Sequence, residues 1–326
     1  MSDKRILELE RKIRELKTFS EDGIDLSAEI EKLESKLHAL TEQEQLSPAP
    51  VSTRPDEWDQ VKLARNPKRP YTLDFIRLMM DYFYELHGDQ MYADDAAIVA
   101  GLALFEGETV VVVGHQKGRD VTENIKRNFG MAHPEGYRKA LRALKLAERF
   151  GFPVISLIDT PAAYPGTGAE ERNIGAAIAQ NIYEMFKLRA PIVVAITGEG
   201  GSGGALGLGI GDRVLMLEHA IYSVIPPEGC AAILFRDASK APEAARAMKV
   251  TAPTLLELQV IDEIIPEPGE GAHTDHETTA ANLKEAIRRH LKALERIPLE
   301  KLLEQRAKKF QAMGVFEELE ETHARE

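Results

Sequence analysis

Residues 191–205 read PIVVAITGEGGSGGA, an apolar run that ends in a glycine-rich segment. The apolar run predicts a buried strand, and the glycines predict a turn into a short helix of small residues. Without Cβ atoms, such a turn exposes main-chain N–H groups at a helix N-terminus, where a negatively charged oxygen can approach closely. The stretch therefore predicts a strand–turn–helix unit that binds an anionic oxygen with its backbone.

Strands and helices alternate on both sides of this unit. The expected strands span residues 97–105, 109–115, 153–158, 191–197, 213–217, 221–225 and 261–265. The expected helices span residues 73–86, 135–150, 169–189, 280–295 and 299–313. A short turn at 106–108 is suited to a hairpin between the first two strands. Strands separated by helices of this length predict an α/β fold with right-handed βαβ crossovers.

The N-terminal segment has a different pattern. Apolar residues recur every three or four positions over 6–16 and 26–40, on helices otherwise dense in charge. We expect a helical hairpin or coiled-coil docking extension over residues 1–46; a solvated helix without a partner is the alternative. Proline at 48 and 50 predicts a linker over 47–70, followed by the main domain at 71–298 and a C-terminal helix and tail at 299–326.

Composition narrows the functional classes. The chain has 326 residues, 44% of them hydrophobic, and a formal charge of −12, which argues against a general nucleic-acid surface. Its single cysteine, Cys230, excludes a disulfide framework and a cysteine-only zinc site, and fits a reducing compartment. Neither a signal peptide nor an apolar run of about 20 residues is present, so we expect a cytoplasmic protein that does not bind membranes.

A second strand-to-helix turn, residues 159–168 (DTPAAYPGTG), follows the strand at 153–158. If the strands at 153–158 and 191–197 are neighbours in a parallel sheet, both turns lie at its carboxyl edge, where α/β sheets bind ligands. One N–H group from each turn would then bracket a single oxygen. That arrangement is an oxyanion hole.

Other interpretations of the glycine-rich turn stay open. Ser202 lies in a G-x-S-x-G pattern, which is typical of a hydrolase nucleophile, but the histidines that follow it are poorly placed for a triad. A Walker-type phosphate loop lacks its Gly-Lys-Ser/Thr. Tight packing without a ligand is the remaining alternative.

Three further features carry weaker signals. His273 and His276 flank Asp275 and suggest either a metal site or a solvated loop. Cys230, in an apolar run, is expected to be a buried helix residue. The basic residues near the hairpin form either a solvated face or a surface for phosphates or an acidic partner. They are Lys117, Arg119, Lys126 and Arg127.

Several long blocks make the chain resemble the alpha subunits of bacterial acetyl-CoA carboxylase carboxyltransferase. The resemblance covers residues 58–268 densely, and the N-terminal helices match in kind. The blocks are RPYTLD at 69–74, YADD at 92–95, GHQKGR at 114–119, RNFGM at 127–131, PEGYRKA at 134–140, GAEER at 168–172, GEGGSGGA at 198–205, PEGCA at 227–231 and IIPEP at 264–268.

This resemblance implies a crotonase-like (ClpP/crotonase) spiral of ββα units with a helical N-terminal extension and C-terminal helices. It implies a heterotetramer of two alpha and two beta subunits, with a zinc ribbon only in the beta subunit and no metal in this chain. Together the subunits would move a carboxyl group from biotin, on the biotin carboxyl carrier protein, to acetyl-CoA. The malonyl-CoA formed would serve fatty acid synthesis, with biotin carboxylase as a further partner in the complex.

By the same resemblance, this chain receives carboxybiotin and its backbone stabilises charge on the ureido oxygen. The implied donors are the amides of Gly203 and Gly204, with Ala162 or Ala163 opposite. The implied carboxybiotin pocket adds Gly200, Gly201, Tyr164 and Gly166, while Lys117, Arg119, Lys126 and Arg127 are candidate contacts for CoA phosphates or the carrier. The chain departs from the family pattern at Ala162, where glycine is usual, and at Pro226, where serine is usual.

Two other functions remain open from the sequence. A self-sufficient hydratase or hydrolase of the crotonase class would need a carboxylate near the glycine-rich turn, and Glu199 and Glu228 are the candidates. A non-catalytic scaffold would use the N-terminal helices to dock its partner.

Overall fold

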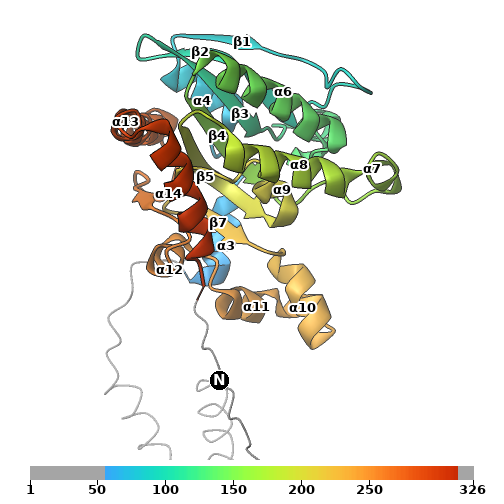
Figure 1. The fold of residues 1–326 in the computed structure, drawn as a ribbon. Coiled ribbons are helices and arrows are strands. Elements are labelled where there is room, and N and C mark those ends of the chain that lie inside the picture. The colour runs from blue at the N-terminus through green and yellow to red at the C-terminus, as the bar shows by residue number, and fades with distance from the viewer. Residues whose placement is uncertain (1–55, 315–326) are drawn as a thin grey trace, which may run out of the picture. The chain divides into compact units, whose positions relative to one another are not determined.

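A single mixed sheet lies at the centre of the computed structural model, which describes residues 56–314 (Figure 1). The predicted helical extension at 1–46 and most of the C-terminal tail lie outside the described residues. The strands are β1 (Tyr82–Glu85), β2 (Ile98–Phe105), β3 (Glu108–His115), β4 (Val154–Thr160), β5 (Ile192–Gly201), β6 (Arg213–Leu217), β7 (Ile221–Ser223) and β8 (Glu263–Ile265). Their order is β1-β2-β3-β4-β5-β6-β8, and β7 pairs with the end of β5.

The sheet changes from antiparallel to parallel at β3. Strands β1 to β3 are antiparallel, and β2 and β3 form the predicted hairpin, with Ile98 opposite His115. From β3 onward every pair in the sheet is parallel. All residues of β4 and β5 are buried, which explains why both read as continuous apolar runs instead of alternating ones.

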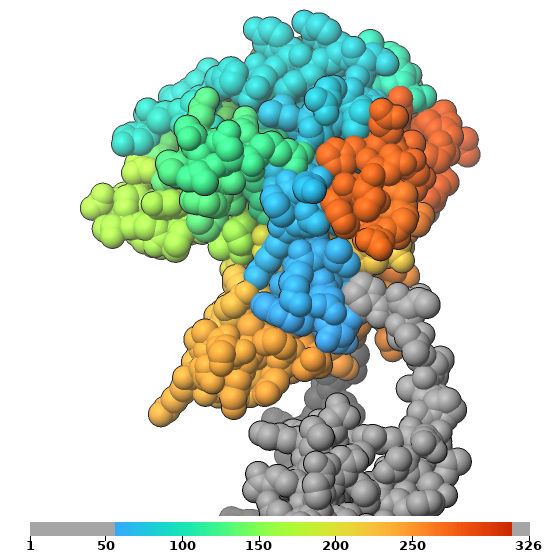
Figure 2. All heavy atoms as spheres, turned by 180° about the vertical axis from the view of Figure 1, so that it is seen from behind, coloured from blue at the N-terminus to red at the C-terminus, as the bar shows by residue number. Residues whose placement is uncertain are grey.

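Helices cover both faces of the sheet. Helices α6 and α8 pack together on one face, and α4 and α13 pack together on the other (Figures 1 and 2). The helices before β5 are α3 (Glu57–Ala64), α4 (Thr72–Met79), α5 (Val121–Lys126), α6 (Pro134–Phe150), α7 (Thr167–Glu171) and α8 (Ile174–Lys187). Those after it are α9 (Ser202–Leu206), α10 (Pro227–Phe235), α11 (Ala241–Met248), α12 (Ala252–Glu257), α13 (His276–Leu294) and α14 (Leu299–Gln311). None of the described helices is long and apolar enough to cross a membrane.

Helix α14 is fixed to the domain by one buried arginine. The Arg306 guanidinium donates to both carboxylate oxygens of Asp212, at 2.9 and 2.8 Å. It also donates to three carbonyl oxygens at the end of α8 and the start of β5, those of Met185, Leu188 and Ala190. Both side chains of this ion pair are almost completely buried. The C-terminal helix is therefore anchored by a charge that has no access to water.

The helix predicted over 73–86 is wrong in its second half. Helix α4 ends at Met79, and Tyr82–Glu85 form the edge strand β1. A β-carbon on Gly101 of β2 would lie 2.2 Å from the Tyr84 carbonyl oxygen, so the glycine allows β1 to lie close to β2. Pairing with β2 overrides the helical spacing of the apolar residues.

Two other predicted segments differ from the structure. The helix predicted over 169–189 is divided into α7 and α8, because Asn173 has a left-handed φ of 64°. The predicted linker at 47–70 contains helix α3, whose Val61 and Ala64 are buried against β7 and α11. In Figure 2, α3 lies against the segment that contains α10 and α11. The linker prediction is therefore wrong for residues 57–64.

Helix α10 differs from expectation in its exposure. Cys230 lies in this helix, but it is only half-buried, so the prediction of a buried cysteine is wrong. The neighbouring Ile233 and Leu234 are 70% and 66% exposed. The apolar run that suggested a core helix thus lies largely on the surface, because α10 projects from the sheet beside α11 (Figure 1).

Candidate functional site

The two predicted turns meet at the carboxyl edge of the sheet. Strands β4 and β5 pair in parallel from Val154 opposite Ile192 to Ile158 opposite Ile196. The register then shifts, so that Thr160 lies opposite Gly200. The expectation that these strands are neighbours is confirmed. The turn at 159–168 and the start of α9 therefore lie side by side.

Glycine lets the two turns approach each other closely. A β-carbon on Gly204 would lie 2.4 Å from the Ala162 carbonyl carbon and 2.5 Å from the Ala163 nitrogen. A β-carbon on Gly201 would lie 1.9 Å from the Pro161 carbonyl oxygen. Since backbone atoms cannot move aside as a flexible side chain can, only glycine fits at these two positions. By contrast, a β-carbon on Gly203 would meet nothing closer than Ile178 Cδ1 at 3.7 Å.

Several N–H groups at this junction have no acceptor in the part of the chain that the structure describes. Gly203 and Gly204 lie in the first turn of α9, where an N–H group has no intrahelical partner. The Ala162 N–H donates to the Thr160 hydroxyl at 3.3 Å, whereas the Ala163 N–H makes no hydrogen bond to any of the described residues. Of the two candidate donors in this turn, the geometry favours Ala163.

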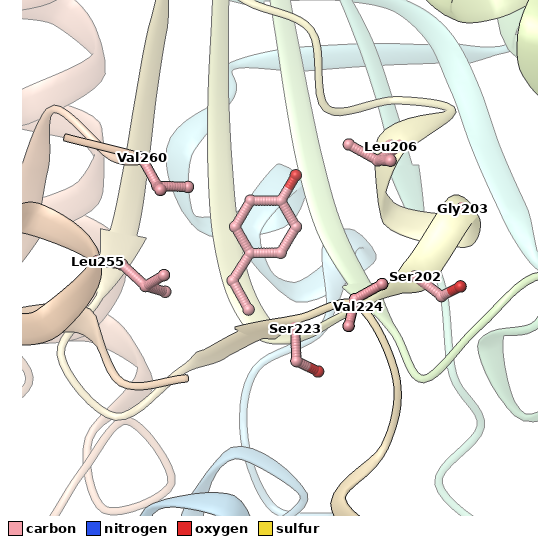
Figure 3. Close-up of a pocket in the computed structure, with 8 residues that line it drawn as sticks. Ser202, Gly203, Leu206, Ser223, Val224, Leu255 and Val260 are labelled. Atoms are coloured by element: carbon pink, nitrogen blue, oxygen red, sulfur yellow. The ribbon is translucent and has the colours of Figure 1, made fainter. Parts of the chain in front are cut away.

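A cavity of about 260 Å³ opens beside α9 (Figure 3). Leu255 and Val260 lie on one side of it, and Gly203 and Leu206 lie on the other. Ser202, Tyr222, Ser223 and Val224 complete the lining. Burial raises the pKa of the Tyr222 phenol to about 12, so its hydroxyl stays protonated at neutral pH. The cavity is thus mainly apolar, and Gly203 lies at one edge of it.

The other residues predicted for the pocket lie elsewhere. Gly200 and Gly201 are buried in β5, opposite Tyr222 and Ser223 of β7, so they pack the sheet and do not face this cavity. Tyr164 stacks on His133, with 4.1 Å between ring centroids. Gly166 precedes α7 and packs against the Tyr164 ring. None of these four residues lines the cavity beside α9.

Ser202 has the backbone of a nucleophile elbow but lacks its partners. It follows β5, begins α9 and has a φ of 56°, as a strand–turn–helix elbow requires. Its hydroxyl makes no hydrogen bond to any histidine within residues 56–314. His219, the next histidine along the chain, contacts Gln60 at 2.9 Å. The arrangement does not favour a serine hydrolase.

Charged side chains beneath the turns form a network that the sequence did not suggest. Lys117 Nζ donates to Asp159 Oδ1 at 2.7 Å and to Glu199 Oε2 at 2.9 Å. Arg65 donates to Glu199 Oε1 at 2.7 Å and to both oxygens of Glu228, at 2.5 and 3.1 Å. Arg65 lies 134 residues before Glu199, so no local pattern links them. Lys117, predicted as a phosphate or carrier contact, is instead part of this inner network.

The network holds both candidate acid–base carboxylates in the ionised form. Burial favours the neutral form of Glu199, but Lys117 and Arg65 outweigh it and lower the Glu199 pKa. The hydrogen bonds from Arg65 likewise lower the pKa of Glu228. For Lys117, burial is outweighed by Asp159 and Glu199, and its pKa is raised. Carboxylates paired in this way are poor proton donors at neutral pH, which argues against a self-sufficient hydratase.

The other three basic residues differ in their surroundings. The Arg119 guanidinium lies 4.0 Å from the centre of the Tyr71 ring and donates to the carbonyl oxygens of Pro67 and Arg69. Arg127 pairs with Glu123 and donates to the Ala96 carbonyl. Lys126 is exposed and forms no ion pair within the described ranges. Of the four, only Lys126 is free to meet a phosphate or an acidic partner without giving up contacts seen here.

His115 is completely buried behind the glycine-rich turn. Its ring lies beside the backbone of Leu157 and Gly204, and neither ring nitrogen has a hydrogen-bond partner within residues 56–314. Burial, with a smaller effect of Lys117, lowers the pKa of His115 to about 3. The imidazole is therefore neutral in the folded chain throughout the physiological pH range.

Acidification from pH 7 to pH 5 is expected to destabilise the chain through His115. An unfolded histidine binds a proton near pH 6.5, whereas the folded one stays neutral down to about pH 3, so the unfolded state binds more protons between these values. Stability therefore falls as pH falls, by about 2 kcal/mol at pH 5. Urea denaturation of wild type and His115→Gln at both pH values measures this. Equal pH dependence of the two proteins would contradict the assignment.

The histidines suggested as metal ligands do not form a metal site. His276 Nε2 lies 2.6 Å from the Lys68 carbonyl oxygen, and Asp275 caps α13 by accepting from the Thr278 N–H. Within residues 56–314, no group of three or more histidine, cysteine, aspartate or glutamate side chains is placed to hold a metal ion.

Comparison with known families matches almost the whole chain. A family described as acetyl co-enzyme A carboxylase carboxyltransferase-like matches residues 2–314. The alpha subunit of acetyl-coenzyme A carboxylase carboxyl transferase from Geobacter metallireducens is 53% identical over 316 residues, 97% of both chains. The same subunit from Thermus thermophilus is 54% identical over 319 residues, 97% of this chain and 98% of the relative.

Solved structures with little sequence identity share the fold. The transcarboxylase 12S structure matches with a TM-score of 0.57 and 18% identity, over 76% of this chain and 46% of that one. A chain of a Pseudomonas malonate decarboxylase hetero-tetramer matches with a TM-score of 0.58 and 16% identity, over 74% of this chain and 94% of the other. The predicted crotonase-like α/β fold is thereby confirmed.

Proposed function

The chain belongs to the family of acetyl-CoA carboxylase carboxyltransferase alpha subunits, and we propose that its two adjoining turns bind the ureido group of carboxybiotin. As a carboxyltransferase subunit it acts in fatty acid synthesis, within a complex that includes other subunits. The transferred carboxyl group comes from biotin on a carrier protein and passes to acetyl-CoA, which gives malonyl-CoA.

One observation carries this proposal. The amides of Gly203, Gly204 and Ala163 lie where the two turns adjoin, and none of them has an acceptor in the described structure. Loss of the carboxyl group from carboxybiotin places negative charge on the ureido oxygen. Fixed N–H groups aimed at that oxygen stabilise the charge without any reorganisation, and one such donor is typically worth about 10²–10³ in rate.

The cavity beside α9 suits the rest of the ligand. Its walls include the side chains of Leu206, Leu255 and Val260, which can pack against the apolar part of the fused two-ring system of biotin. The protonated Tyr222 hydroxyl is a further donor at the cavity. None of the described carboxylate or imidazole side chains lines it. The contribution of this chain is therefore binding and electrostatic stabilisation, and the acetyl thioester is held by the partner beta subunit.

By this proposal the chain supplies one half of the active site, and the beta subunit supplies the other half. We infer an assembly of two alpha and two beta subunits that receives the biotin carboxyl carrier protein, with zinc in the beta subunit alone. The amides of this chain would face the biotin, and the beta subunit would stabilise the enolate of acetyl-CoA.

Reconstitution tests the proposed function directly. Malonyl-CoA formation from carboxylated biotin and acetyl-CoA is measured with this chain alone, with the beta subunit alone, and with both together. We expect activity only in the mixture, because each subunit supplies one half of the site. Activity of this chain alone would contradict the half-site, and an inactive mixture of well-folded subunits would contradict the reaction.

A further inference from the structure

We propose that Arg65 is a positioning residue for carboxyl transfer, which fixes the glycine-rich end of β5 against the start of α10. This inference rests on the proposed function, because it concerns the same pair of turns. Arg65 touches neither the cavity beside α9 nor the amides of the oxyanion site. It acts through two carboxylates, Glu199 and Glu228, which belong to the two elements that it joins.

The guanidinium is presented by a firmly packed helix. Arg65 follows the last residue of α3, and α3 is anchored by Val61 and Ala64 in a small core shared with Ile221 of β7 and Ala245 of α11. From there it makes three hydrogen bonds, one to Glu199 and two to Glu228. The planar fork of arginine can bridge two carboxylates in this way, whereas the single ammonium of lysine cannot reproduce the geometry.

On the β5 side, the clamp continues to the first turn. Glu199 is also bound by Lys117, and its N–H donates to Asp159 Oδ1 at 2.9 Å. Asp159 begins the turn at 159–168. A β-carbon on Gly198 would lie 2.4 Å from Asp159 Oδ1, so glycine at this position makes room for the carboxylate. The chain of contacts therefore links Arg65 to both turns of the proposed oxyanion site.

On the other side, the clamp holds a wall of the cavity. Glu228 lies in the first turn of α10, and the residues just before this helix include Ser223 and Val224, which line the cavity beside α9. Arg65 itself lines a very small gap with Glu199, Gly201, Ser223 and Pro226. Arg65 thus ties the cavity wall to the strand that carries the glycine-rich turn.

Loss of Arg65 would leave this region with unbalanced charge. The network holds two cations, Arg65 and Lys117, and three carboxylates, those of Asp159, Glu199 and Glu228. Without Arg65, Glu228 has no cationic partner among the described residues, and it repels Glu199. The added negative potential also opposes the charge that develops on the nearby ureido oxygen.

The test uses the reconstituted enzyme of this chain and the beta subunit. Arg65→Met is expected to lower kcat about tenfold and to leave the KM for acetyl-CoA unchanged within about twofold, since that substrate is held by the partner. The kcat of Arg65→Lys should lie between those of Arg65→Met and the wild type.

A second substitution and a control complete the test. Glu228→Gln in the Arg65→Met background should raise kcat at least about threefold above that of Arg65→Met alone, because it removes the unpaired charge. Arg288→Met, which breaks an exposed pair with Glu285 on α13, is the matched control and should retain wild-type kinetics.

Each outcome decides the inference. Rescue of kcat by Glu228→Gln supports the clamp when Arg65→Met and the double variant are equally folded at the assay temperature, because a purely structural role would act only through the folded fraction. A kcat for Arg65→Met within about twofold of wild type, or a lowered melting temperature alone, overturns it. If Arg65→Met does not fold, kcat is compared instead between Arg65→Lys and the double variant Arg65→Lys with Glu228→Gln, and the same results support or overturn the inference. If the wild-type mixture is inactive, the proposed function is wrong. If the wild type, Arg288→Met and Arg65→Met are all equally active, the proposed function stands and only the inference about Arg65 is wrong.

Discussion

Gly204→Ala is expected to lower the kcat of the reconstituted carboxyltransferase about 10²–10³-fold. The alanine methyl would lie 2.4–2.5 Å from the peptide that joins Ala162 and Ala163, so the two turns must separate. The Gly204 N–H itself remains, and alanine is a better helix former than glycine. The loss would therefore come from displaced donors and not from a missing amide or a weaker helix.

Gly175→Ala is the matched control for this change. It makes the same substitution in the first turn of another helix, α8, outside the two turns, and its methyl would meet no atom of the described residues within 4 Å. We expect its effect on kcat to be on the order of twofold. Steady-state kinetics of both variants, with circular dichroism to verify folding, makes the comparison. Equal losses in the two variants would show that the close approach of the turns is not what sets the rate.

Arg306→Met is expected to lower the free energy of unfolding by about 3–5 kcal/mol. The change leaves Asp212 buried without its charge partner and removes the donor from three carbonyl oxygens. For a domain of this size, the expected fall in melting temperature is about 10 °C. Differential scanning calorimetry of the variant and the wild type measures it.

Arg189→Met is the control for this change, because it removes an exposed ion pair of α14 instead of the buried one. Arg189 pairs with Glu300 of the same helix α14, but the two side chains are 50% and 78% exposed. Exposed pairs contribute at most about 1 kcal/mol, so this variant should melt within a few degrees of wild type. If Arg306→Met melts no lower than Arg189→Met, α14 is not held by the buried charge.

Much of the fold follows from local sequence patterns. The apolar runs of β4 and β5, the hairpin of β2 and β3, and the amphipathic helix α6 were all predictable, because each depends on periodicity within a short segment. The failures share one cause. Residues 82–85 became a strand through pairing with β2, and residues 57–64 became a helix by docking on β7 and α11. Contacts with distant residues override weak local preference in both segments.

The features of the candidate site also fall into two groups, those that local sequence determines and those that depend on contacts between distant residues. By itself, the sequence determined that glycine-rich and proline-rich turns follow two successive strands, and that the glycine-rich turn leads into a short helix, since these features depend on residue type and local spacing. Only the tertiary structure decided that Gly204 lies so close to the 162–163 peptide that a β-carbon would not fit, and that the Ala162 N–H donates to the Thr160 hydroxyl. The tertiary structure also turned Lys117 inward to Asp159 and Glu199, and brought Arg65 to Glu199 and Glu228. These side-chain contacts join residues 42 to 163 positions apart. They depend on strand order and on the register shift between β4 and β5, which no local pattern encodes.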